Sequence, residues 1–218
     1  RHNIKLSPKV GDNVSVYKYS IDKGDFHAEN VKIGNGEIRF DFITPKGIID
    51  NIQLGVPVKI NIENGIGSMA LAWLNGVTAD ELRHAMATFQ GAKRRFDFLL
   101  KTDKVVMIDD YAHHPEELTA SITSVKELYP DKKLTGIFQP HLFSRTKDFA
   151  PEFAKSLSLL DELILLDIYP AREKPIEGVT SKIIFDKVTC PKVLCNKEEL
   201  LSLLEKKNDM EVLLTVGA

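Results

Sequence analysis

The feature that most constrains the fold is an alternation of apolar runs with helical segments in the second half of the chain. Four runs suit buried strands: KVVMID, KLTGIFQP, ELILLDIY and EVLLTVGA. Between the first two, a segment that starts near residue 115 carries apolar residues on one helical face: Leu118, Ile122, Val125 and Leu128. Because strands that alternate with helices build largely parallel sheets, we predict a Rossmann-like open α/β sheet with flanking helices over residues 94–218.

The first part of the chain has a different pattern. Apolar residues alternate in runs at 14–21, 36–44 and 47–54, and turn signals such as Asn35-Gly36 separate these runs. Two helical segments follow, and Thr78 is placed to cap the second. We therefore predict a β-rich unit with antiparallel strands and two helices over residues 1–93. Both ends of the chain are abrupt, so we expect it to be part of a longer protein.

Composition and missing motifs exclude several classes of protein. With 29 Lys and Arg against 31 Asp and Glu, the charge balance predicts neither a nucleic-acid nor a membrane partner. Cys190 and Cys195, in a chain without a signal peptide, favour cytosolic thiols over a disulfide. The sequence has no phosphate loop, no nucleophile elbow and no zinc signature. GIGSMA, at residues 65–70, fits a dinucleotide loop only weakly, since no strand with a ribose-binding acid follows.

Polar residues gather directly after the first predicted strand of the α/β part. The stretch DDYAHHPEEL contains Asp110, Tyr111 and His113, and residues at this end of a parallel strand face the ligand-binding edge of the sheet. The alternative is that Asp110 merely caps the following helix and that the histidines are solvated. Paired histidines lack the spacing of common zinc sites, so we predict no metal-ligating residue here.

The next two strand ends should meet the first at the same sheet edge. FQPHLFSRT supplies His141 and Arg145, and an arginine fork suits a carboxylate or a phosphate, although a lone loop arginine is common. The third loop carries Tyr169 and Glu173, which border the site or merely stabilise a turn.

Further candidates lie before the α/β part. Asn61 and Asn64 stand at the start of a helix, where side-chain amides read a purine edge or simply cap the helix. Arg94 and Arg95 lie at the junction of the two parts, where they follow phosphates or ribose or pair with Asp97.

Taken together, DDYAHHPEE, FQPHLFSRT and DIYPAREKPIEGVTS resemble the carboxy-terminal domain of the Mur ligases, and the likeness spans about residues 55 to 218. It is closest to the members that add L-alanine to UDP-N-acetylmuramate. By this resemblance, residues 1–93 are the latter part of the central ATP-binding domain. The sugar-nucleotide domain and the phosphate loop would then lie earlier in the same polypeptide.

The resemblance implies a cytoplasmic ligase of peptidoglycan precursor synthesis. Its cofactors would be ATP and Mg²⁺, and its substrates UDP-N-acetylmuramate and L-alanine. ATP would convert the muramyl carboxylate into an acyl phosphate, and the amine of L-alanine would then displace phosphate. Two alternatives stay open: a ligase that recycles whole peptides onto UDP-N-acetylmuramate, and a non-catalytic α/β module that binds a small anion. We expect the 218-residue chain alone to be inactive.

The resemblance also implies roles for individual residues. Nucleotide contacts fall to Asn61, Asn64, Arg95 and Asp110. The part of the site that binds the amino-acid substrate would be lined by Tyr111, His113, His141 and Arg145. The last three are the catalytic candidates, and Arg145 would bind the substrate carboxylate. The family usually has histidine where Ile60 stands and a basic residue where Leu142 stands.

Overall fold

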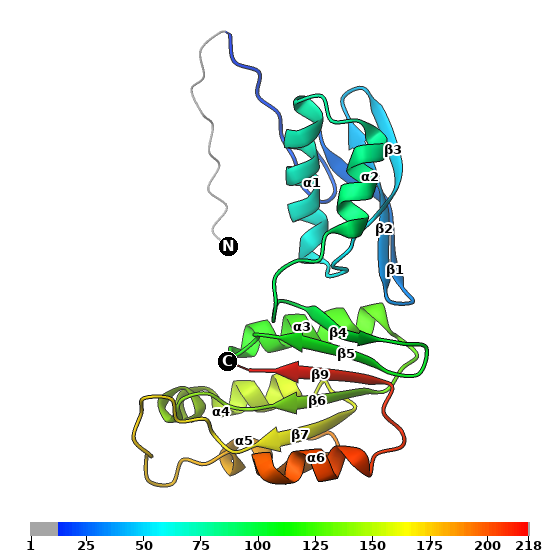
Figure 1. Ribbon diagram of the computed structural model, residues 1–218. Helices are drawn as coiled ribbons and strands as arrows, with labels where there is room; N and C mark the ends of the chain where they lie inside the picture. Colours follow the sequence, from blue (N-terminus) through cyan, green and yellow to red (C-terminus); the bar gives the residue numbers. More distant parts are fainter. Residues whose placement is uncertain (1–12, 218) are drawn as a thin grey trace.

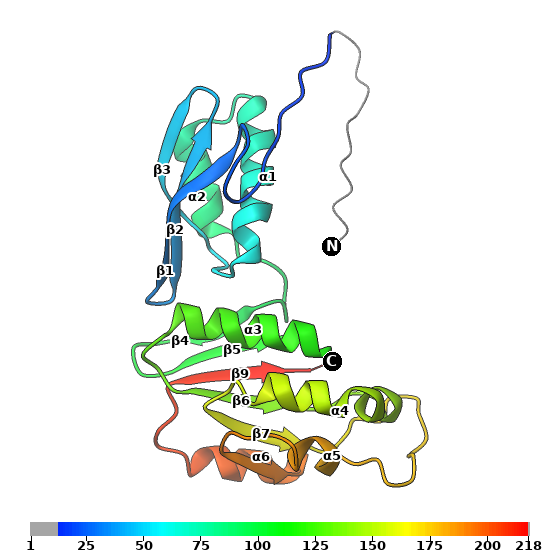
Figure 2. The same ribbon diagram turned by 180° about the vertical axis from the view of Figure 1, so that it is seen from behind.

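The computed structural model describes residues 13–217, which form two layered parts joined by a short linker (Figure 1). In the first part, strands β1 (His27–Gly34), β2 (Glu37–Thr44) and β3 (Gly47–Gln53) form an antiparallel sheet in that order. Helices α1 (Ile60–Leu74) and α2 (Ala79–Thr88) cover one face of it, as Figure 2 shows from behind. Alternate β2 side chains are buried, as the sequence predicted.

One prediction for this part is wrong, and one weak motif is shown not to be a loop. Residues 14–21 form no strand; they make a single bridge, Tyr19 to Phe26, because the chain turns back where Lys18 donates its amide to the Asp25 carboxylate at 2.7 Å. The GIGSMA stretch is no dinucleotide loop either. It lies inside α1, where Gly65 packs against Met86 and Gly67 against the ring of Tyr19.

The second part is the predicted open α/β sheet. Its strands are β4 (Asp97–Lys101), β5 (Val106–Asp110), β6 (Leu134–Phe138), β7 (Glu162–Leu166), β8 (Lys192–Cys195) and β9 (Val212–Val216). Their order is β4-β5-β9-β6-β7-β8, and only the edge strand β4 pairs antiparallel. The sequence missed both edge strands.

Helices cover both faces of this sheet. Helices α3 (Pro115–Leu128), α4 (Phe143–Leu157) and the short α5 (Lys182–Phe185) pack on one face, and α6 (Lys197–Glu205) packs on the other. The predicted apolar face of α3 is confirmed, because all its members are buried: Leu118, Ile122, Val125 and Leu128. Successive residues of β9 alternate between the two cores, which is the pattern of a strand buried on both sides.

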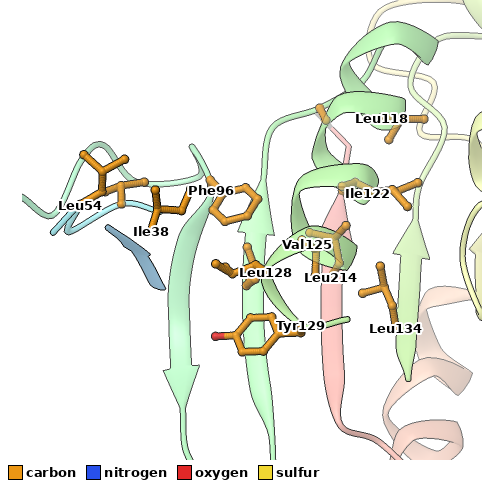
Figure 3. Packing of buried hydrophobic residues seen from close by; sticks show 14 of the residues in the cluster. Ile38, Leu54, Phe96, Leu118, Ile122, Val125, Leu128, Tyr129, Leu134 and Leu214 are labelled. Atoms are coloured by element: carbon orange, nitrogen blue, oxygen red, sulfur yellow. The ribbon is translucent and has the colours of Figure 1, made fainter. Parts of the chain in front are cut away.

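The two parts contact each other beside the linker. Figure 3 shows Phe96 between Ile38 of the first part and Leu128 of α3, and all three side chains are buried. At the tip of the β1–β2 hairpin, the amide of Gly36 donates to the carbonyl of Leu128 at 3.1 Å. Lys101 Nζ donates to the carbonyl of Gly36 at 3.0 Å. No helix among residues 13–217 is long and apolar enough to cross a membrane.

Candidate functional site

A cleft of about 1190 Å³ lies between the two parts. Its walls come from the start of α1, the linker, the end of β5 and the exposed side of α3. Five of the predicted site residues line it, and we call them the cleft group: Asn61, Asn64, Arg95, Asp110 and Tyr111. The volume is that of a site for a whole small molecule, since ligand pockets usually measure about 300–1,000 Å³.

The two asparagines form a pair in the first turns of α1. Asn61 Nδ2 donates to the carbonyl of Val56 at 3.1 Å, and Asn64 Nδ2 donates to Asn61 Oδ1 at 3.2 Å. These bonds tie the side chains to each other and to the segment before the helix, which differs from the capping alternative. Linked amides on a cleft wall present donors and acceptors of the kind that a heterocyclic base requires.

Asp110 ends β5 and is largely enclosed. Burial raises the pKa of this carboxyl, and the hydroxyl of Ser121, nearby backbone amides and the charge of Arg95 partly oppose that rise. The alternative that Asp110 caps α3 is wrong. Glu117 does so, because its Oε2 accepts from the amides of His113 and His114 at 3.0 and 3.2 Å. Asp110 is therefore left as an acceptor on the cleft wall, suited to ligand hydroxyl groups.

Both junction arginines lie close to the Tyr111 ring. Arg94 and Arg95 have guanidinium carbons 4.9 and 5.8 Å from the ring centroid. Arg94 is also tied to the sheet, with Nε 3.3 Å from Asp109 Oδ2 and Nη2 donating to the carbonyl of Gly217 at 2.9 Å. The alternative that these arginines pair with Asp97 is wrong for Arg94, because its guanidinium pairs with Asp109 and only its backbone amide donates to Asp97, at 3.3 Å. Both arginines are exposed, and Arg95 is the one that lines the cleft.

His113 extends this cluster beyond the cleft. Its Nδ1 lies 2.8 Å from the carbonyl oxygen of Tyr111, and its ring meets the Tyr111 ring edge-on at 5.0 Å. A carbonyl only accepts hydrogen bonds, so Nδ1 carries the proton and Nε2 of the neutral ring is an acceptor. His114 differs, because its ring packs edge-on against Phe149, and both side chains are half-buried.

His141 and Arg145 follow β6, whose end lies at the same edge of the sheet as that of β5, with β9 between the two strands. Together with His113 we call them the loop group. His141 Nδ1 and Arg145 Nη1 are buried and have no hydrogen-bond partner among the described residues. Burial, and then the positive charge of Arg145, lower the pKa of His141, and the charge of Glu173 opposes that shift. The His141 ring stacks on Tyr169 at 5.8 Å.

The structure adds an ion pair that the sequence did not indicate and a contact of the third loop, whose role the sequence left open. Lys59 and Glu127, which face each other from α1 and α3, form an ion pair of 3.4 Å across 68 residues of sequence. Glu173 of the third loop accepts from the amide and the hydroxyl of Ser144 at the start of α4, so this loop is attached to the segment that carries His141 and Arg145. No group of three His, Cys, Asp or Glu side chains suited to a metal ion is found within residues 13–217.

Matches to known proteins cover the whole chain. A family model described as "Mur ligase, glutamate ligase domain" matches residues 94–218. Over its full length the chain is 59% identical to the UDP-N-acetylmuramate--L-alanine ligase of Phocaeicola vulgatus, and the match covers 48% of that protein. It is 61% identical to the enzyme of the same name from Parabacteroides distasonis, and that match covers 47% of the relative. The chain therefore spans about half the length of the curated relatives it matches.

Solved structures give the same grouping. The UDP-N-acetylmuramate-alanine ligase of Thermotoga maritima superimposes with a TM-score of 0.73 at 25% identity, over 92% of this chain and 44% of that one. A folylpolyglutamate synthase of Thermotoga maritima shares the fold, with a TM-score of 0.67 at 17% identity over 87% and 43% of the two chains.

Proposed function

The chain belongs to the Mur ligase family, and on this premise we propose that it is the second half of an ATP-dependent ligase that joins L-alanine to UDP-N-acetylmuramate. The relatives with 59% and 61% identity carry the name of that enzyme. The observation that carries the proposal is the cleft between the two parts, because it assembles the cleft group from segments far apart in sequence.

The cleft group is suited to hold ATP. In this proposal the paired amides of Asn61 and Asn64 face the adenine, and the carboxylate of Asp110 accepts from the ribose hydroxyls. Arg95 approaches the phosphates, because an exposed guanidinium at the cleft mouth donates charge-assisted hydrogen bonds to anions. Residues 1–93 would then be the latter part of the central ATP-binding domain, and residues 94–218 the carboxy-terminal domain.

The loop group is suited to hold the amino acid. Arg145 has a buried donor without a partner in the described structure, which a substrate carboxylate would satisfy. The lowered pKa of His141 favours its neutral form, so that ring does not repel an incoming ammonium group. Tyr111 links the loop group to the cleft group through its contact with His113.

The chemistry requires both groups. A carboxylate is a poor electrophile, so ATP first converts the muramyl carboxylate into an acyl phosphate, and the amine of L-alanine then displaces phosphate to form the amide. Mg²⁺ would reduce the charge repulsion among the phosphates. The described residues contain no ready-made set of metal ligands, so we assign no step of this chain to the ion. We place the enzyme in the cytoplasm, in peptidoglycan precursor synthesis.

The test is phosphate release by the full-length protein with ATP, Mg²⁺ and UDP-N-acetylmuramate. We expect release that depends on added L-alanine. Release with L-Ala-γ-D-Glu-diamino acid tripeptide but not with L-alanine would indicate the peptide-recycling ligase instead. Release with neither would leave only a module that binds a small anion.

A further inference from the structure

The carboxylate of Glu173 lies at the start of helix α4. Its Oε2 accepts from the amide of Ser144 at 2.9 Å, and its Oε1 accepts from the Ser144 hydroxyl at 2.5 Å. These two bonds hold the pKa of Glu173 below its usual range. A negative charge at a helix amino terminus is also stabilised by the helix dipole. The donors of Ser144 are therefore taken by a side chain of the protein.

The loop that carries Glu173 holds the β6–α4 connection at a second place. The amide of Tyr169 donates to the carbonyl of Pro140 at 2.8 Å, and the amide of Leu142 donates to the carbonyl of Tyr169 at 3.0 Å. The Tyr169 ring stacks on His141, with 20° between the ring planes. The two loops are thus joined on both sides of the first turn of α4.

This double attachment supports a strained backbone. Leu142 has φ +70°, a left-handed conformation that a branched side chain rarely adopts and that persists only where the surroundings hold it. Its carbonyl accepts from the amide and the hydroxyl of Thr146, at 3.1 and 2.7 Å. Arg145 lies within this turn, so its position depends on the same bonds.

We propose that Glu173 is a positioning residue for the amino-acid substrate. By holding Ser144, it fixes the first turn of α4 so that Arg145 meets the substrate carboxylate. It also occupies the Ser144 donors that would otherwise attract that carboxylate, which leaves the unpartnered atoms of His141 and Arg145 as the receptors. This inference rests on the proposed alanine-adding function and extends it to a residue outside the cleft group and the loop group.

The test uses the full-length enzyme and steady-state kinetics with each substrate varied in turn. Loss of a hydrogen bond to a charged group predicts that Glu173→Ala raises the KM for L-alanine roughly tenfold or more, with the KM for ATP nearly unchanged. Glu173→Gln should have a smaller effect in the same direction, because its amide oxygen still accepts from Ser144. The control is Glu177→Ala, which removes an exposed acid from the same loop.

A double variant separates positioning from general support of the fold. If Glu173 acts through Arg145, then adding Glu173→Ala to Arg145→Ala should raise the KM for L-alanine no further. Additive effects, or an unchanged KM in both Glu173 variants of an active enzyme, would overturn this inference alone. A wild-type enzyme without L-alanine-dependent release would overturn the proposed function and this inference together. Thermal unfolding of the Gln variant shows whether the fold is kept.

Discussion

Replacing Gly36 by alanine should weaken the contact between the two parts of the molecule. Gly36 has φ +74°, and a Cβ built on it would lie 2.5 Å from the Tyr129 hydroxyl oxygen and 3.0 Å from two ring carbons. Its amide and carbonyl are the groups that bind Leu128 and Lys101. The substitution therefore strains the backbone and overpacks the contact at once.

The magnitude follows from two ways in which the protein can respond. If the hairpin stays in place, the left-handed backbone costs about 1–2 kcal/mol and overpacking about 1–3 kcal/mol. If the hairpin moves away, it loses the two hydrogen bonds of Gly36, at about 0.5–1.5 kcal/mol each. The protein adopts the response of lower free energy, so we expect the free energy of unfolding to fall by roughly 1–3 kcal/mol.

Urea unfolding of the chain measures this change, and two further variants identify its cause. The Tyr129 hydroxyl is buried without a partner among the described residues, so Tyr129→Phe alone should cost little and should restore part of the stability of Gly36→Ala. Gly76→Ala is the backbone control, because Gly76 has φ +89° with nothing within 4 Å of its Cβ. Equal losses for Gly36→Ala and Gly76→Ala, with no recovery by Tyr129→Phe, would refute the reasoning.

Three other predictions concern the proposed site. In the full-length enzyme, Arg145→Ala should raise the KM for L-alanine roughly 10- to 150-fold and leave that for ATP almost unchanged; equal effects on both would contradict its role. The 218-residue chain alone should not turn over ATP, because the sequence has no phosphate loop, and measurable phosphate release would disprove this. Burial raises the pKa of Asp110 above its unfolded value, so the folded state binds this proton more tightly, and the carboxyl lowers stability progressively from about pH 4 upward. The free energy of unfolding of Asp110→Asn, relative to that of the wild type, should therefore be higher at pH 7 than at pH 4. A difference between the two proteins that does not change with pH would contradict the assigned cause.

The parts of the fold that the sequence predicted are those where burial alone determines the pattern. The apolar face of α3 repeats at helical spacing because that face lies on the sheet, so its position was readable. The edge strands were not, since Leu99 of β4 and Leu194 of β8 are exposed and give no alternation. Residues 14–21 show the opposite error. They alternate well, but alternation says nothing about whether a partner strand is present.

The same distinction applies to the site. Parallel topology brings strand ends together, so Asp110, Tyr111 and His141 could be placed at one edge from the strand pattern. The opposite wall of the cleft depends on how the linker orients α1, and no local pattern encodes that orientation. For this reason the Lys59–Glu127 ion pair could not be predicted from the sequence. The roles of the individual residues stay predictions until the kinetic tests are made.

The central position of β9 has a consequence for synthesis of the protein. This strand lies between β5 and β6, although it is the last of the described strands to be made. A ribosome adds about 5–20 residues per second, so the roughly 100 residues between β5 and β9 take about 5–20 seconds. During that time β5 and β6 have no common neighbour, and their apolar side chains stay open to chaperones and to other nascent chains. Deletion of β9 would therefore divide the sheet in two rather than trim its edge.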